Sequence, residues 1–266
     1  VELILQYGGT INEIMGDGIL VIFGAPTSAG DDAERGVACA VAMQLAMDQV
    51  NARSRARGLP SIEMGIGIHT GEVIVGNIGS DRRMKYAAVG THVNLAGRIE
   101  SYTTGGQILI SEATMREVRS VVTTGQQIRI EPKGAKRELT LWEVTGIQGS
   151  HDLFLPASEP PMVALAAAIP VRYAMLEQKH VGRSVFEGSF IRLSAKKAEV
   201  HSASLVPVLT NLKMWILGAG AGPEPAELYA KVVEIHAAQG RFTIRFTGMA
   251  PEAEHYLERN AGRPTT

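Results

Sequence analysis

The chain has 266 residues, of which 26 are lysine or arginine and 27 are aspartate or glutamate, so its formal net charge is −1. A chain of this length exceeds the usual size of one domain, and two domains are therefore the starting expectation. Balanced charge gives no electrostatic attraction to nucleic acid or to an anionic membrane, so we expect neither as a partner.

Cysteine content and hydropathy indicate the compartment. The single cysteine, Cys39, excludes an intrachain disulfide and favours a reducing, cytoplasmic location. The longest uninterrupted apolar stretch, residues 162–169, is far shorter than the roughly 20 residues that span a membrane. We therefore expect a soluble chain without a membrane span. Because it begins at Val1, with neither an initiator methionine nor a leader, we expect a longer parent protein.

The first predicted elements are a hairpin, a long helix and a strand pair. Apolar runs on either side of the Gly-Asp-Gly turn at 16–18 predict a hairpin with Asp17 at its tip. A helix capped by an aspartate is expected over residues 31–51. Alternating apolar residues over 62–68 and the run EVIVG at 72–76 predict a second strand pair.

Four further elements complete the first half. Residues 93–101 have helical composition, QILI at 107–110 predicts a strand, and SEATMREV at 111–118 predicts a short capped helix. The run RELTLWEVTG predicts a last strand that ends near Gly146. This order of elements predicts an α+β domain in which helices cover a mixed sheet.

The second half reads as a separate domain. Residues 149–170 contain four prolines and no strong period, so we place a linker at 148–169, between domains at 1–147 and 170–260. Six short runs rich in β-branched or aromatic residues follow, and they predict a small β-barrel. PEAEHYLER at 251–259 predicts a closing helix that begins with proline.

Three polar residues are candidates for chemistry. Asp17 presents a carboxylate between two glycines and could reach a divalent cation, although aspartate in a glycine turn is also ordinary turn chemistry. Asn94 and Arg98 lie four residues apart on a predicted helix and so share one face. They could hold a sugar oxygen and a phosphate charge, or form a solvated helix face.

Taken together, these segments resemble the catalytic domain of class III nucleotide cyclases over residues 8–146. The run GDGILVIFG resembles the segment that carries the second of the family's two metal-binding aspartates, here Asp17. VNLAGR resembles the helix that carries the ribose-orienting asparagine and the transition-state arginine, here Asn94 and Arg98. Lys133 in PKG falls where family members place a lysine on the terminal phosphates. FGAP, DDAERGV and GIGIHTGE occur in the family's order.

The resemblance implies a fold and a reaction. The fold is ferredoxin-like, and the sites form between the subunits of a head-to-tail homodimer. The ribose 3′-hydroxyl of GTP or ATP attacks the α-phosphorus with the help of two Mg²⁺ or Mn²⁺ ions, and pyrophosphate leaves.

The first departure from the family pattern concerns the metal site. The first metal-binding aspartate of the family lies in a strand well before the hairpin, and residues 1–7 contain no such segment, so that strand and the helix after it are missing. We expect this chain alone to bind metal poorly and to be inactive.

The second departure concerns the base. Glu13 stands where adenylyl cyclases commonly carry lysine, and a carboxylate accepts hydrogen bonds from guanine but not from adenine N1. Ala87 stands at the second base-reading position and cannot hydrogen-bond through its side chain. GTP is therefore favoured over ATP, and an inactive dimerisation or regulatory module is the alternative. His69 and His92 are expected to be packed or surface residues, because no further ligand lies at metal spacing.

Residues 171–260 are similar to PilZ domains, small barrels that often bind cyclic di-GMP. FIRLSAKKAEVHS stands where those domains carry DxSxxGxxV, with Ser194 kept and Arg192 and Lys197 replacing the aspartate and the glycine. Only Arg172 remains of the two arginines that clamp the guanines. We therefore expect no cyclic di-GMP binding, and a structural or partner-docking role for this barrel.

Overall fold

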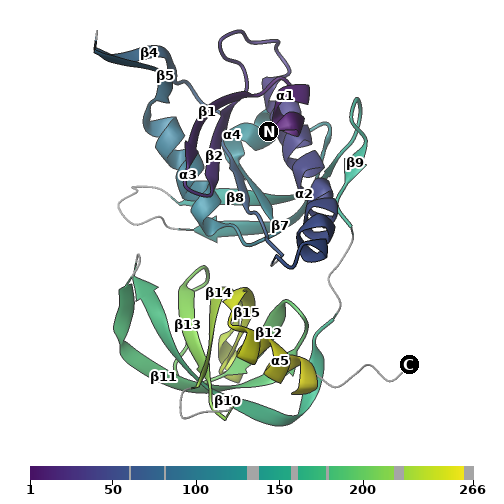
Figure 1. Cartoon of the computed structure of the whole chain (residues 1–266), viewed down its shortest axis with the longest axis vertical. Coiled ribbons are helices and arrows are strands. Elements are labelled where there is room, and N and C mark those ends of the chain that lie inside the picture. The colour runs from purple at the N-terminus through teal and green to yellow at the C-terminus, as the bar shows by residue number, and fades with distance from the viewer. Residues whose placement is uncertain are drawn as a thin grey trace. The chain divides into compact units, whose positions relative to one another are not determined.

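The computed structural model describes residues 1–59, 61–80, 82–130, 138–156, 161–177, 180–218 and 225–260. The chain divides into two compact units, Val1–Ala157 and Ser158–Thr266, each with its own core (Figure 1). Among the described residues, no helix combines the length and apolar composition that crossing a membrane requires.

The first unit combines helices and strands, as the sequence predicts. Its elements are α1 (Glu2–Gln6), β1 (Thr10–Met15), β2 (Gly18–Ile22), α2 (Asp32–Ala56), β3 (Ile66–Ile68), β4 (Ile74–Ser80), β5 (Arg83–Val89), α3 (Thr91–Tyr102), β6 (Ile108–Ser111), α4 (Glu112–Val118), β7 (Val122–Ile130), β8 (Leu139–Ile147) and β9 (Leu153–Phe154).

The predicted hairpin is confirmed as β1 and β2, which pair antiparallel. Gly16 has a φ of 64°, a left-handed conformation that glycine adopts without a steric penalty and that closes the turn at Asp17. Within the described residues the hairpin forms a two-stranded sheet of its own. The main sheet runs β3-β6-β8-β7, with β9 also on β8, and β3 lies at its outer end. Only β3 and β6 pair in parallel, so the sheet is mixed.

The predicted pairing of residues 62–68 with EVIVG is wrong. Polar side chains of α2 hold the backbone before β3: Asn51 bonds both the N–H and the carbonyl of Ile62, and Gln44 donates to the carbonyl of Met64. β3 then pairs with β6, whereas β4 pairs antiparallel with β5. Strand periodicity identified a strand here but not its partner, since the partner depends on contacts remote in sequence.

Helices cover both faces of the main sheet. Successive residues of a strand point to opposite faces, and β6 shows this directly. Ile108 and Ile110 pack with Val41 of α2 in one buried cluster, whereas Leu109 packs with Ile99 of α3 in another. The sheet therefore carries α2 on one face and α3, with the candidate residues Asn94 and Arg98, on the other.

The second unit is the predicted barrel. Its six strands close in the order β10-β11-β12-β15-β14-β13, and all pair antiparallel. The elements are β10 (Val163–Glu177), β11 (His180–Leu193), β12 (Lys197–His201), β13 (Asn211–Ile216), β14 (Ala226–His236), η1 (Ala237–Gln239), β15 (Arg241–Met249) and α5 (Pro251–Asn260). Ala253 and Leu257 of α5 are buried in the barrel core, so the predicted closing helix packs on the barrel.

Two strands lie within the predicted linker of residues 148–169. β9 pairs with β8 of the first unit, and β10 begins at Val163. The register of β10 against β11 shifts between Ala164 and Ile169, which explains why this alanine-rich stretch shows no strand period in the sequence. The connection between the units is therefore shorter than predicted.

Candidate nucleotide site

Asp17 lies at the tip of the β1–β2 hairpin and is exposed to solvent. A free carboxylate on a tight turn is the ligand type that Mg²⁺ and Mn²⁺ prefer. The described residues contain no group of three or more His, Cys, Asp or Glu side chains that could hold a metal ion. Asp17 thus fits one ligand position, and the residues described here do not complete a metal site.

Glu13 of β1 forms an ion pair with Lys85 of β5, with 2.5 Å between Oε1 and Nζ. The two side chains are 41% and 47% exposed, so they are accessible to a ligand. Beside them, the buried Asn12 accepts a hydrogen bond from the backbone N–H of Ala88 over 2.9 Å. This bond fixes β5 against β1 beside the Glu13–Lys85 ion pair.

Ala87 borders an open surface beside this ion pair. It lies two residues from Lys85 on β5, so both side chains point to the same face of the strand. Its partner across the hairpin is Gly76 of β4, and a Cβ built on Gly76 would meet no atom within 4 Å. Neither residue therefore carries a side chain beyond Cβ on this part of the hairpin.

Asn94 and Arg98 lie on α3, and both are exposed, as their predicted common face requires. The opposite side of the helix packs tightly. Ile99 is fully buried, and a Cβ on Gly67 of β3 would lie 2.2 Å from the backbone nitrogen of Glu100. Among the described residues, Asn94 and Arg98 form no hydrogen bond or ion pair with the hairpin. Lys133 lies outside the described residues.

His69 and His92 pack on each other at the start of α3, the helix that carries His92. His69 Nε2 lies 2.7 Å from His92 Nδ1, and His69 Nδ1 lies 2.7 Å from Ser111 Oγ. Burial and the neighbouring His92 lower the pKa of His69 to about 4, so this ring is neutral at neutral pH. Both histidines are partly buried, and their contacts are with each other and with a serine. They are packed residues, in line with the sequence expectation.

The barrel residues that stand in the cyclic di-GMP motif have partners within the barrel. Arg172 pairs with Glu187 at 3.3 Å. Arg192 lies 3.7 Å from Glu199 and also donates to the carbonyl of Met162. The hydroxyl of Ser194 accepts from the N–H groups of the next lysines and closes the turn before β12.

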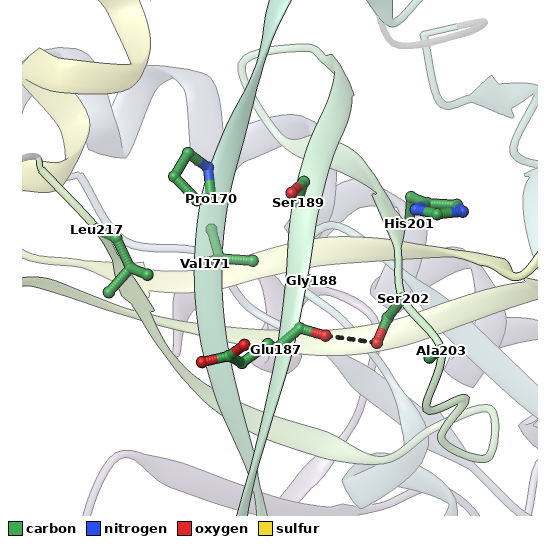
Figure 2. Close-up of a pocket in the computed structure, with 9 residues that line it drawn as sticks. All are labelled: Pro170, Val171, Glu187, Gly188, Ser189, His201, Ser202, Ala203 and Leu217. Carbon is green, nitrogen blue, oxygen red and sulfur yellow. Dashed lines mark hydrogen bonds between the residues drawn. The ribbon is translucent and has the colours of Figure 1, made fainter.

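Figure 2 shows a pocket of about 360 Å³ on the barrel, formed by β10, β11 and β12. Its lining includes Ser202, Glu187 and His201 but none of the cyclic di-GMP motif residues. The hydroxyl of Ser202 already donates to the carbonyl of Glu187, as the dashed line marks. Its lining residues include one exposed carboxylate, one imidazole and two serine hydroxyls but no arginine or lysine, so the pocket offers little to recognise an anionic ligand.

The folded first unit and its candidate residues define a protein class. Residues 2–146 match the model of the adenylate and guanylate cyclase catalytic domain, and the chain belongs to this family.

Individual relatives agree with this class. The chain is 32% identical over 148 residues to adenylate cyclase 1 of Rhizobium meliloti (strain 1021), covering 55% of this chain and 22% of that protein. It is similar to the crystal structure of the guanylyl cyclase Cya2, with 54% identity, 58% of this chain and 79% of that chain covered, and a TM-score of 0.57. The adenylyl cyclase CyaB from P. aeruginosa shows 36% identity, coverage of 57% and 78%, and a TM-score of 0.53.

The match to whole proteins is partial. The chain spans 22% of adenylate cyclase 1 and 28% of the adenylate cyclase of Anabaena cylindrica.

Sequence reasoning missed Lys85. It lies 72 residues from Glu13, and neither the period nor the composition of β5 singles it out. The sequence nonetheless held a signal. Lys85 lies two residues before Ala87, the second base-reading position, and its charge complements that of Glu13.

Proposed function

We propose that the full-length protein is a nucleotide cyclase that converts a nucleoside triphosphate, GTP in preference to ATP, to a 3′,5′-cyclic nucleotide and pyrophosphate. The observation that carries the preference is the Glu13–Lys85 ion pair beside the open surface at Ala87 and Gly76. An ionised carboxylate accepts from the N1–H and the exocyclic amine of guanine, whereas adenine N1 is itself an acceptor. Ala87 adds no second hydrogen bond to the base.

The remaining candidate residues act on the sugar and the phosphates. Asn94 orients the ribose, and Arg98 stabilises the charge that develops as the 3′-oxygen bonds to the α-phosphorus and pyrophosphate leaves. Lys133 binds the terminal phosphates. Asp17 would hold Mg²⁺ or Mn²⁺, whose charge would offset that of the phosphates, together with a second carboxylate that residues 1–7 do not supply.

We further propose that the site forms in a homodimer, with Glu13 and Asp17 from one subunit and Asn94 and Arg98 from the other. Exposed apolar side chains on the β4–β5 hairpin support this assembly: Ile74 is 71% exposed and Met84 is 60% exposed. A two-stranded hairpin is marginally stable in water, and such a patch favours burial against another chain. The buried single cysteine, Cys39, supports a cytoplasmic signalling role.

Turnover of GTP and ATP by the full-length protein in Mn²⁺ tests the substrate proposal. We expect higher kcat/KM with GTP, and a Glu13→Lys variant should lose roughly a hundredfold of that value because a cation faces the donor edge of guanine. Lys85→Met keeps the stem of the side chain but not its charge, and should lower selectivity for GTP. Equal, background-level turnover of both nucleotides would contradict the proposal and would favour the inactive regulatory module.

For the PilZ-like barrel we propose a structural or partner-docking role without cyclic di-GMP. The motif residues support this: only Arg172 of the two clamping arginines is present, and Arg192 places a cation where the motif carries an aspartate. Isothermal titration of cyclic di-GMP into the chain should give no heat of binding. A micromolar isotherm would show that the proposal is wrong.

A further inference from the structure

A line of hydrogen bonds runs from α3 to α4 through two histidines. The imidazole of His92, in the first turn of α3, bonds that of His69 in the loop after β3. His69 in turn bonds Ser111, whose hydroxyl accepts from the N–H of Thr114 and so caps α4. The two imidazole rings stack, with centroids 5.0 Å apart and an interplanar angle of 26°.

The far end of this line is fixed in the fold. Ser111 is 2% exposed and Thr114 is fully buried. The Thr114 hydroxyl receives a hydrogen bond from Thr70, one residue after His69, over 3.1 Å. The loop that carries His69 is therefore held to the capped end of α4 at two neighbouring residues, and His69 is a rigid attachment point.

The start of α3 lacks the usual anchors of a helix. Its N-cap is Gly90, which has no side chain to accept a bond from the first turn, and that turn contains no acidic residue. Within the described part of the chain, the side-chain hydrogen bond that holds this first turn runs from His92 to His69. A Cβ on Gly71 would lie 2.4 Å from the His92 ring, so glycine at this position makes room for the ring.

The position of His92 on the helix connects this anchor to the candidate site. Residues two apart on a helix lie roughly 200° apart around its axis, so His92 points inward where Asn94 points to solvent. Arg98 lies one turn beyond Asn94, on the same exposed face. A rotation or tilt of the first turn would therefore displace both functional side chains.

We propose that His92, held by His69, is a positioning residue that sets the orientation of the α3 face carrying Asn94 and Arg98. The inference rests on the proposed function of those two residues. It assigns the histidine pair a role in aligning α3, beyond filling space beneath the helix.

The chemistry of the pair supports a directional bond. A neutral imidazole has one N–H and one acceptor nitrogen. Since His69 is neutral at neutral pH, it donates to one of its two neighbours and accepts from the other. A hydrogen bond with a defined direction at 2.7 Å fixes the ring of His92 more narrowly than apolar packing does.

Two substitutions of His92 by residues of similar shape distinguish a positioning role from simple space filling. His92→Asn keeps a hydrogen-bonding group where Nδ1 lies, whereas His92→Leu has the same shape without it. In cyclase assays of the full-length protein, we expect His92→Leu to lower kcat roughly tenfold at nearly unchanged KM, because misplaced transition-state groups affect the chemical step. His92→Asn should recover most of the loss. Equal kcat values for the two variants, with equal melting temperatures, would overturn the proposal.

A second readout is independent of activity. In the chain of residues 1–266, the backbone amide resonances of Asn94 and Arg98 and the side-chain amide resonances of Asn94 should shift in His92→Leu and remain near wild-type values in His92→Asn. If the wild-type protein is inactive with both nucleotides, the proposed function fails, and these resonances still test the positioning role. Unshifted resonances in His92→Leu would rule it out.

Discussion

Single side chains in the first unit differ in how far the sequence reveals them. Asp17, Asn94 and Arg98 are recognisable because local motifs surround them, and the structure leaves all three exposed on the elements predicted to carry them. Lys85 and the His69–His92 pair act through partners remote in sequence. Local patterns carry no information about which remote residues meet. These contacts could therefore be identified only from the three-dimensional structure.

The lowered pKa of His69 predicts how the stability of the first unit depends on pH. The unfolded chain takes up a proton on this residue near 6.5, but the folded chain does so only near 4. Protons thus favour the unfolded state between these values, so stability is full above about pH 6.5 and falls as the pH drops towards 4.

Urea unfolding at pH 7 and pH 5 measures this effect. In a Trp215→Phe background, which removes the tryptophan fluorescence of the barrel, the fluorescence of Trp142 in β8 reports on the first unit. We expect a lower urea midpoint at pH 5, and a smaller pH difference in His69→Asn. The same pH dependence in both proteins would assign the effect to other groups.

At the scale of elements, strands of polar or small residues escaped prediction. β5 and β7 contain little apolar alternation, and they become strands because β4 and β8 supply their hydrogen-bonding partners. Apart from α1, which was not predicted, the helices were better predicted, since their caps and apolar spacing are local. α2 and α4 begin at or within one residue of the predicted starts.

The contact between α3 and β3 predicts a sharp difference between two glycines. Gly67→Ala places a Cβ against the backbone of α3, and we expect a loss of about 1–3 kcal/mol in the free energy of unfolding of the first unit. Gly97→Ala, within α3 itself, meets no atom within 4 Å and should stabilise by up to about 1 kcal/mol. Urea unfolding, followed by the fluorescence of Trp142 in the Trp215→Phe background, measures the free energy of unfolding of both variants. Equal effects would mean that α3 does not pack on β3 this closely.

At the scale of the whole molecule, composition and turn residues were enough to predict two domains and a closed barrel. The sequence did not reveal that the described strands of the first unit form three separate sheets: β1–β2, β4–β5 and the main sheet. The hairpin β1–β2 and the outer strand β3 do not pair in the described residues.

The proposed dimer predicts complementation between two inactive proteins. Asp17→Asn and Arg98→Ala each damage both sites of their own homodimer. In a mixed dimer, one site combines both defects and the other has neither, so an equal mixture should recover about a quarter of wild-type activity. Cyclase assays of the full-length variants, alone and after mixing, measure this. Activity that stays at the level of the separate variants would contradict a shared site.

The closed barrel limits how this protein can recognise a partner through its second unit. Each of the six strands has a neighbour on both sides, so the backbone donors and acceptors are used within the barrel wherever the registers overlap. β11 pairs with β10 from His180 to Leu193 but with β12 only from Ser189 to Leu193, which leaves one edge of its first half without a strand partner among the described residues. A peptide could bind by β-augmentation, the mode that needs an exposed strand edge, only along such a stretch. Elsewhere a partner must be recognised by side chains on the outer face of the barrel or by its loops, and those are the positions where substitutions would change specificity without unfolding the domain.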